Sequence, residues 1–169
     1  MTSQASQLTK EEFLAKVGHV FEHSPWVAEA AWDRGLVTDA HTALGVHRAL
    51  CGAFRSVSPE RRMQVLRSHP DLAGRLALLG GLTAHSAAEQ ADAGLDACTP
   101  KELTRFAQLN DYYTRRFGFP FIIAVRGKTR NQILSIFEDR AANTPEDEFE
   151  IACDEVERIA LLRLKDILP

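Results

Sequence analysis

Residues 99–118, TPKELTRFAQLNDYYTRRFG, carry the signals of one complete α-helix with both of its ends marked. Thr99 and Glu102 match a capping box, in which the threonine hydroxyl and the glutamate each bond a backbone N–H that the helix leaves unpaired. Pro100 suits the first helical position, where the missing N–H has no partner to lose, and Gly118 suits a left-handed stop. Between these ends, apolar side chains repeat at helical spacing: Leu103, Phe106, Leu109, Tyr113 and Phe117.

Similar signals on both sides of this helix predict a helical protein throughout. Helices are expected from Thr9, from Ser24-Pro25 to a stop at Gly35, from Thr38 to Arg55, from Ser58-Pro59 to Ser68, from Thr129 to Ala142, and from Thr144 onward. The last helix is expected to bury Phe149, Ala152, Cys153, Val156, Ile159, Ala160 and Ile167. Residues 69–98 are expected to be mostly irregular, with a short helix over Ser86–Ala93. The chain shows no repeat and no linker, so we predict one all-α domain, a single helical bundle over residues 1–169.

One stretch, FPFIIAV at residues 119–125, departs from the helical pattern. Its β-branched and aromatic residues lack helical polar spacing and predict an extended segment. A single strand has no partner, yet its backbone N–H and C=O groups need hydrogen bonds. Two answers are open: a ligand lies alongside the segment, or water and helix side chains bond it.

Composition excludes several classes of protein. Hydrophobic residues make up 45% and charged residues 25% of the chain, which is typical of a globular protein. The net charge of −3 and the absence of a basic run give no case for nucleic acid. No apolar run approaches the roughly 18 residues that span a bilayer, and the polar N-terminus lacks a signal core. Cys51, Cys98 and Cys153 fit reduced thiols, so we expect a cytoplasmic protein.

The segments HPDLAG (residues 69–74) and LTAHSAAEQ (residues 82–90) hold the candidate chemistry. His69 has the side chain whose ordinary pKa lies nearest neutrality, and it suits a general acid or base. Glu89 could hold its ring in place. Each also has a plain reading: a histidine before proline is often a turn residue, and a lone glutamate is often solvated.

Other candidate sites are weaker. Ser86 fits the N-cap of the short helix, with Glu89 completing a capping box, although a helix start can also bind an anionic substrate group. Arg163 interrupts an apolar face and points either into a pocket or, by its long stem, to the surface. His19 and His23 could share a helix face but lack a third ligand, so no metal site is predicted. The chain has no nucleophile elbow and no nucleotide-binding loop.

Taken together, the chain resembles the 2-oxo-4-hydroxy-4-carboxy-5-ureidoimidazoline decarboxylases, which complete the breakdown of urate to (S)-allantoin. The resemblance is carried by six ordered motifs over nearly the whole chain: Phe21–Val27, His69–Gly74, Leu82–Gln90 with Ala93–Asp96, Phe106–Asn110, Arg116–Gly127 and Glu155–Leu164. It implies an all-helical enzyme that needs no cofactor or metal, acts on a small ureidoimidazoline and commonly forms homodimers. The hydrolase domain sometimes fused to this family is not expected here.

The resemblance also implies roles for individual residues. The proton-transfer histidine falls on His69 and its carboxylate partner on Glu89. The expected substrate contacts are Pro70, Ser86, Ala87, Ala88, Glu89, Gln90, Phe121, Ile122, Ile123, Ala124, Val125 and Arg163. Residues 121–125 would meet the ligand through their backbone.

Two other classes of function stay open at this point. A non-catalytic helical module could bind a partner through an aromatic surface around Trp26 and residues 117–121. A different cofactor-free lyase could act on a related ureido acid, because the same polar groups would serve it.

Overall fold

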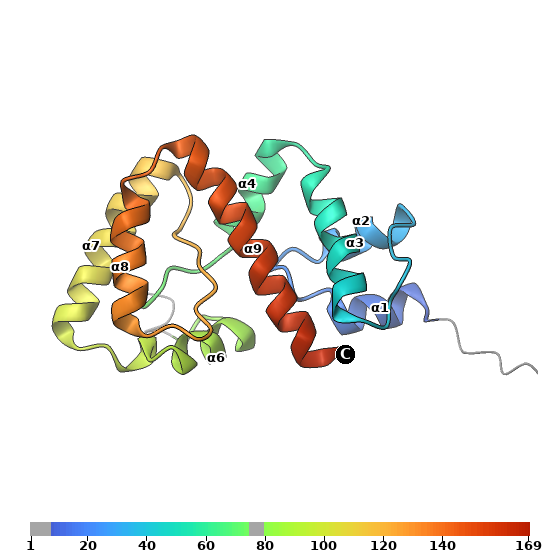
Figure 1. Ribbon diagram of the computed structural model, residues 1–169, viewed down its shortest axis with the longest axis horizontal. Coiled ribbons are helices and arrows are strands. Elements are labelled where there is room, and N and C mark those ends of the chain that lie inside the picture. The colour runs from blue at the N-terminus through green and yellow to red at the C-terminus, as the bar shows by residue number, and fades with distance from the viewer. Residues whose placement is uncertain (1–7, 75–79) are drawn as a thin grey trace, which may run out of the picture. The chain divides into compact units, whose positions relative to one another are not determined.

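α-Helices make up most of the chain (Figure 1). The computed structural model describes residues 8–74 and 80–169, and within these ranges it contains no β-strand, which confirms the all-α prediction. The elements are α1 (Lys10–Val17), α2 (Trp26–Asp33), α3 (Ala43–Arg55), α4 (Pro59–Arg67), α6 (Ala84–Asp92), the 3-10 helix η1 (Leu95–Ala97), α7 (Pro100–Phe117), α8 (Arg130–Ala141) and α9 (Pro145–Ile167). No helix in the described ranges has both the length and the apolar character that crossing a membrane requires.

The structure confirms the predicted helix starts at which a threonine cap is followed, three residues later, by an acid or an amide. Thr9, Thr99 and Thr129 each accept the backbone N–H three residues later, and each helix returns a side chain to its cap. At the other end of α7, Gly118 has a φ of 80°, the left-handed conformation predicted for it. These signals succeed because both partners of the bond lie within one turn of each other.

The predicted start of α6 is wrong. Thr83, not Ser86, is the N-cap: its hydroxyl oxygen accepts the Ser86 N–H at 3.3 Å, and the Ala87 N–H donates to the Thr83 carbonyl at 2.9 Å. The earlier start gives the helix another turn of backbone bonds. It also places Ser86 inside the first turn, where it is buried.

Two further starts differ from the prediction. Ser24 does not cap α2, because its hydroxyl donates to the Glu22 carbonyl at 2.9 Å. α3 begins at Ala43 rather than near Thr38, because Asp39 accepts bonds from the Thr42 hydroxyl and the His41 N–H and holds this part of the chain outside the helix.

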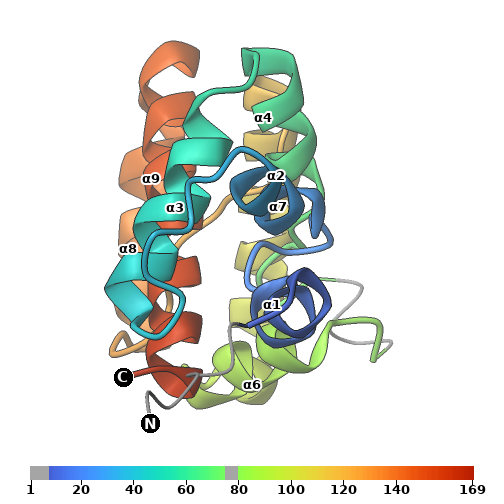
Figure 2. The same ribbon diagram turned by 90° about the vertical axis from the view of Figure 1, so that its right-hand side faces the viewer.

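The described chain gathers into two units. The first comprises the residues up to Val65 together with Glu157–Pro169, and the second comprises Leu66–Val156. In the first unit, α2 packs against α1 and α3 (Figure 2). The Phe21 and Phe54 rings lie 5.3 Å apart in its core, and the Ala43 N–H donates to the carbonyl of Pro169 at 2.7 Å.

The core of the second unit is built around Tyr113 of α7, whose ring contacts those of Phe117, Phe119, Phe121 and Phe137 at centroid distances of 4.4–5.8 Å. Phe121, from the extended segment, stacks on Phe137 of α8 at 3.8 Å. The connection from α7 to α8 is therefore fixed to both helices by aromatic packing.

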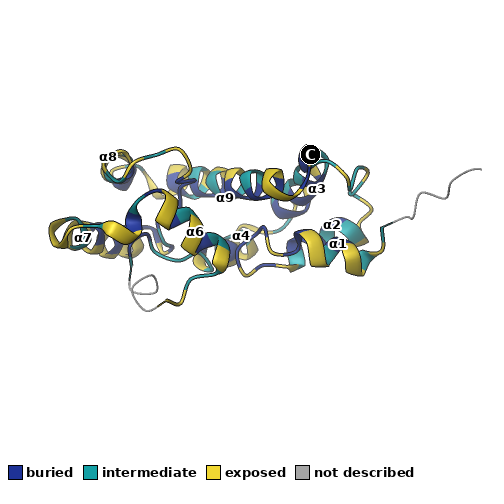
Figure 3. Ribbon diagram, turned by 90° about the horizontal axis from the view of Figure 1, so that it is seen from below, coloured by how far each residue is buried: buried dark blue, intermediate teal, exposed yellow. Residues whose placement is uncertain are grey.

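α9 buries most of the predicted stripe, and Figure 3 shows buried and more exposed residues alternating along it. Two members of the stripe were wrong: Phe149 is half-buried and Ile167 is exposed. Two charged residues take buried positions instead, Glu148 at 0% and Arg163 at 2% exposure. Both find ionic partners, which apolar periodicity alone does not reveal.

Candidate functional site

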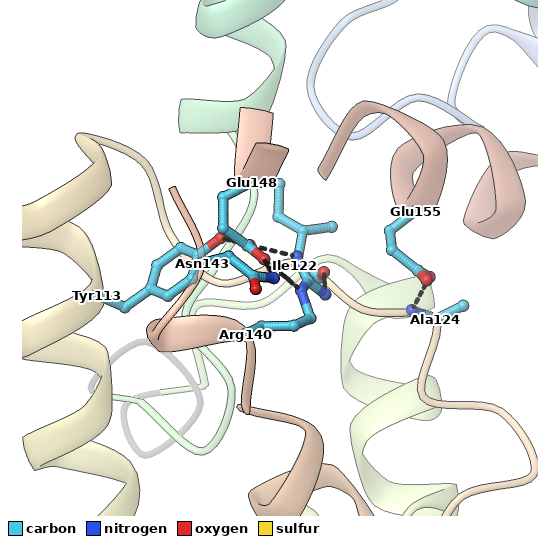
Figure 4. Close-up of polar contacts among 7 residues, drawn as sticks. All are labelled: Tyr113, Ile122, Ala124, Arg140, Asn143, Glu148 and Glu155. Atoms are coloured by element: carbon cyan, nitrogen blue, oxygen red, sulfur yellow. Dashed lines mark hydrogen bonds and ion pairs between the residues drawn. The ribbon is translucent and has the colours of Figure 1, made fainter. Parts of the chain in front are cut away.

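The predicted extended segment is present, and its side chains from Phe121 to Val125 are all buried. Side chains of neighbouring helices bond part of its backbone (Figure 4). The Ile122 carbonyl accepts from Arg140 Nη1 at 2.6 Å, and the Ala124 N–H donates to Glu155 Oε2 at 2.9 Å. For these groups the second of the two open answers, bonding by helix side chains, is correct.

Ile123 lies between these two held residues. Within residues 8–74 and 80–169, neither its N–H nor its C=O takes part in a hydrogen bond. The residue as a whole, backbone included, is only 5% exposed. A backbone donor and acceptor in such surroundings need a partner from outside the described chain, so for this residue the first of the two answers, a ligand, is still open.

A buried polar cluster supports the segment from behind (Figure 4). Glu148 Oε2 accepts from Arg140 Nη2 at 3.0 Å and from the Tyr113 hydroxyl, while its Oε1 accepts from Asn143 Nδ2 at 3.0 Å. Burial and the Glu148 carboxylate raise the pKa of Tyr113, so the phenol stays protonated as a donor. The Arg140 guanidinium also stacks on the Phe121 ring, 4.4 Å from its centroid.

The turn that follows His69 is held by two buried amides. Gln90 of α6 accepts the Ala73 N–H at 3.0 Å and donates to the Asp71 carbonyl at 3.3 Å. Asn110 of α7 donates to the Leu72 carbonyl at 3.0 Å. His69 itself is half-buried, and its N–H donates to the Leu66 carbonyl at 3.2 Å. The structure thus joins the predicted segments 69–74 and 82–90.

The predicted contacts on α6 lie on different faces. Ser86 and Gln90, four residues apart, are buried, Glu89 is half-buried, and Ala87 and Ala88 are exposed. Ala87 and Gln90 line a cavity of about 470 Å³ that also borders Ala73 of the turn. Both atoms of the Gln90 amide already bond this turn, so its first role is to hold the turn.

Arg163 belongs to the first unit and is not a surface residue. It is 2% exposed, its Nη1 lies 2.9 Å from Glu22 Oε2, and it donates to the Val20 carbonyl at 3.3 Å. The surface reading is therefore wrong, and its contact with substrate stays a prediction.

Neither metal binding nor thiol chemistry finds support in the residues. In the described ranges no group of three or more His, Cys, Asp or Glu side chains is placed to hold a metal ion. Burial, together with the nearby Glu157 carboxylate, raises the pKa of the Cys51 thiol, which favours the unreactive protonated form.

Sequence reasoning missed the residues that hold the candidate site: Arg140, Glu148, Glu155, Asn110 and Glu22. The available signal was weak. Glu148 stands four residues before Ala152 on the stripe that was expected to be buried, and a charged residue there indicates a buried partner. Nothing in the sequence identifies that partner as Arg140.

The chain is similar to known proteins over nearly its full length. The sequence profile of the OHCU decarboxylase family matches residues 6–165. The 2-oxo-4-hydroxy-4-carboxy-5-ureidoimidazoline decarboxylase of Halalkalicoccus jeotgali is 38% identical, over 96% of this chain and 88% of that one. The enzyme of the same name from Amia calva is 38% identical, over 98% of this chain and 93% of its own length.

A solved structure supports the same relationship. The crystal structure of (S)-allantoin synthase matches with a TM-score of 0.74 and 30% identity, over 95% of this chain and 51% of the longer synthase chain. The crystal structure of an OHCU decarboxylase in the presence of (S)-allantoin, 24% identical with a TM-score of 0.65, shares the fold. The resemblance inferred from the six motifs is confirmed: the chain belongs to the OHCU decarboxylase family.

Proposed function

We propose that this protein decarboxylates 2-oxo-4-hydroxy-4-carboxy-5-ureidoimidazoline to (S)-allantoin, with His69 as the general acid and base and Glu89 as its partner. The observation that carries the proposal is the hydrogen-bonded joint between the His69 turn and α6. Through Gln90, this joint fixes the backbone next to His69 against the helix that bears Glu89. Catalytic groups require such fixed geometry, because orientation accounts for much of the rate that enzymes achieve.

The chemistry follows from the substrate. Its carboxylate sits on a carbon that also bears a hydroxyl and adjoins the ring carbon carrying the ureido group. When the C–C bond to the carboxylate breaks, CO₂ leaves and the electron pair moves into the ring, where the C=N nitrogen accepts it and takes up a proton. The resulting enol loses its O–H proton, and the ureido-bearing carbon gains a proton. Overall, one proton replaces one CO₂.

His69 suits both proton steps, since an imidazole can accept the hydroxyl proton and return a proton to carbon. Delivery to one face of the ring would set the S configuration. Glu89, half-buried on α6, would hold the imidazole.

The backbone of residues 121–125 would recognise the rest of the substrate. Ile123 has a donor and an acceptor without partners among the described residues. An amide or ureido edge presents the complementary pair, a C=O beside an N–H. The proposed substrate contains such edges, and this supports the assignment of the segment as a ligand contact.

The non-catalytic alternative finds less support. It needs an exposed aromatic surface around residues 117–121, but Phe117, Phe119 and Phe121 are buried against Tyr113. Trp26 is half-buried, with the Arg61 guanidinium 4.2 Å from its ring centroid.

The decisive variant is His69→Ala, assayed by circular dichroism of the allantoin that forms when urate, urate oxidase and hydroxyisourate hydrolase are mixed with the protein. The wild type should produce an (S)-allantoin signal faster than the uncatalysed decay. The variant should lose about 10²–10⁴-fold in turnover, the usual contribution of general acid–base catalysis, and its product should lose stereochemical purity.

His41→Ala is the matched control, because it removes an exposed histidine of the first unit and should leave turnover unchanged. Near wild-type turnover and stereoselectivity in His69→Ala would remove His69 from the mechanism. No acceleration by the wild type would overturn the proposed function.

Four further predictions belong to this proposal: the homodimer and the Arg163 contact rest on the resemblance, and the cytoplasmic location and the single domain rest on the sequence. The protein would act as a homodimer in the cytoplasm, Arg163 would contact the substrate, and residues 1–169 would work as one domain. The matched region, residues 6–165, includes parts of both units, which agrees with one functional domain.

A further inference from the structure

Two helices hold the extended segment by hydrogen bonds at alternate residues (Figure 4). Arg140 of α8 donates Nη1 to the Ile122 carbonyl at 2.6 Å, and Glu155 of α9 accepts the Ala124 N–H at 2.9 Å. The second edge of the Arg140 guanidinium is fixed by Glu148, which is fully buried and seven residues before Glu155 on α9. Residues spaced by seven share a helix face, so one face of α9 supplies both carboxylates.

Stability alone is a poor explanation for this arrangement. A buried ion pair carries a large desolvation penalty, and well-packed apolar residues often replace such a pair without loss of stability. The planar guanidinium offers something that apolar packing does not, which is a fork of donors in fixed directions. Here one edge of the fork meets a carboxylate and Nη1 meets a single backbone carbonyl. The arrangement therefore sets a position.

That position determines where Ile123 directs its polar groups. In an extended chain the N–H and C=O of one residue point to the same side, and those of the next residue point to the opposite side. The Ile122 carbonyl and the Ala124 N–H are both taken by α8 and α9. The Ile123 N–H and C=O accordingly point away from Arg140 and Glu155, and no described residue bonds them.

We propose that Arg140 and Glu155 are positioning residues for the reaction: they fix Ile122 and Ala124 so that Ile123 presents its N–H and C=O to an amide or ureido edge of the substrate. This inference rests on the proposed function and adds the residues that act through the segment. It follows that loss of either hydrogen bond, from Arg140 or to Glu155, should weaken substrate binding more than it slows the chemical step.

The test compares Glu155→Gln with Glu155→Leu in the full chain. Glutamine keeps an oxygen that accepts the Ala124 N–H, whereas leucine has none. Glu150→Leu is the matched control, since Glu150 is an exposed glutamate of the same helix. The measurements are KM and kcat in the coupled assay, binding of (S)-allantoin by calorimetry, and hydrogen exchange of the Ala124 amide by NMR.

Glu155→Leu should raise KM and weaken (S)-allantoin binding by about tenfold, which corresponds to about 1.4 kcal/mol, with kcat changed much less. Its Ala124 amide should exchange faster than in the wild type. Glu155→Gln and Glu150→Leu should both resemble the wild type. If Glu155→Leu does not fold, Glu155→Ala, which adds no volume, replaces it with the same expectations.

Arg140→Lys tests the hydrogen bond that Arg140 donates to the Ile122 carbonyl. A lysine ammonium can pair with Glu148 but lacks the two-edged fork, so KM should again rise more than kcat falls.

A folded Glu155→Leu protein with wild-type KM and wild-type (S)-allantoin affinity would overturn this inference alone. Equal losses in the Gln and Leu variants, with unchanged exchange at Ala124, would overturn it too, because the charge rather than the hydrogen bond would then matter. A wild-type protein that does not accelerate (S)-allantoin formation would overturn the proposed function together with this inference.

Discussion

At the scale of single residues, the turn after His69 is held in a conformation that its own sequence does not favour. Ala73 has a φ of 47°, in the left-handed region that residues with a Cβ rarely adopt. Such a conformation costs on the order of 1–3 kcal/mol and persists only where the surroundings enforce it. Gln90 and Asn110 provide that enforcement through three hydrogen bonds to the turn. The geometry next to the proposed catalytic residue therefore depends on side chains from two other helices.

Asp71 of the same turn gives a pH-dependent test. Burial raises the pKa of its carboxyl above the ordinary value of 3.8, so the folded protein holds this proton more tightly than the unfolded chain. Stability from this group is present at low pH and is lost as the pH rises from 3.8 through the raised pKa. Asp71→Asn removes this loss. The free energy of unfolding of the variant, relative to wild type, should therefore increase as the pH rises from about 3 to about 7.

Urea unfolding of both proteins across this pH range measures the difference. Asp139→Asn, which replaces an exposed carboxylate, is the control. If the free energy of unfolding of Asp71→Asn, relative to wild type, instead decreases as the pH rises, the surroundings of Asp71 stabilise its charged form.

At the scale of elements, glycines at two kinds of position predict opposite effects of the same substitution. Gly118 ends α7 with a φ of 80°, and an added Cβ would meet only the far end of Arg67 at 3.7 Å. Backbone strain alone should therefore lower the free energy of unfolding of Gly118→Ala by about 1–2 kcal/mol relative to wild type. Gly52 lies inside α3, where a Cβ would make ordinary contact with Leu36 at 3.7 Å. The free energy of unfolding of Gly52→Ala should be about 0.5–1 kcal/mol higher than that of the wild type.

Thermal and urea unfolding of the two variants would test this pair. Equal shifts in the same direction would mean that cavity and contact effects outweigh the backbone term at one of the two sites.

The same scale shows what the sequence could and could not predict. The ends of α7 were predictable because Thr99, Glu102 and Gly118 act on neighbours within one or two turns. The start of α6 was not, because Thr83 and Ser86 are both competent caps three residues apart, and the glutamate after Ser86 favoured the wrong one. The sequence could not predict which side chains bond the extended segment, because Arg140 and Glu155 contact it only after α8 and α9 have packed.

At the scale of the whole molecule, two deeply buried ion pairs each include a residue with a proposed role at the site. In the second unit, Arg140 and Glu148 lie behind the extended segment. In the first unit, Arg163 pairs with Glu22, next to His23, whose φ of 49° is again left-handed for a residue with a Cβ. Removing one partner of such a pair leaves an unpaired buried charge and typically costs about 3–5 kcal/mol. Both pairs thus combine a proposed role at the site with a contribution to the stability of the fold.

The whole molecule also bears on the prediction that the reaction needs no metal or cofactor. The substrate contains its own electron acceptor, the ring C=N, and His69 with Glu89 would handle the protons. We therefore expect that EDTA treatment, followed by removal of the chelator before the coupling enzymes are added, leaves kcat/KM for (S)-allantoin formation unchanged. Mock-dialysed protein is the control. Activity that is lost after chelation and restored by one added divalent cation would show that a metal takes part, and the roles of His69 and Glu89 would then have to be reassigned from proton transfer to metal binding.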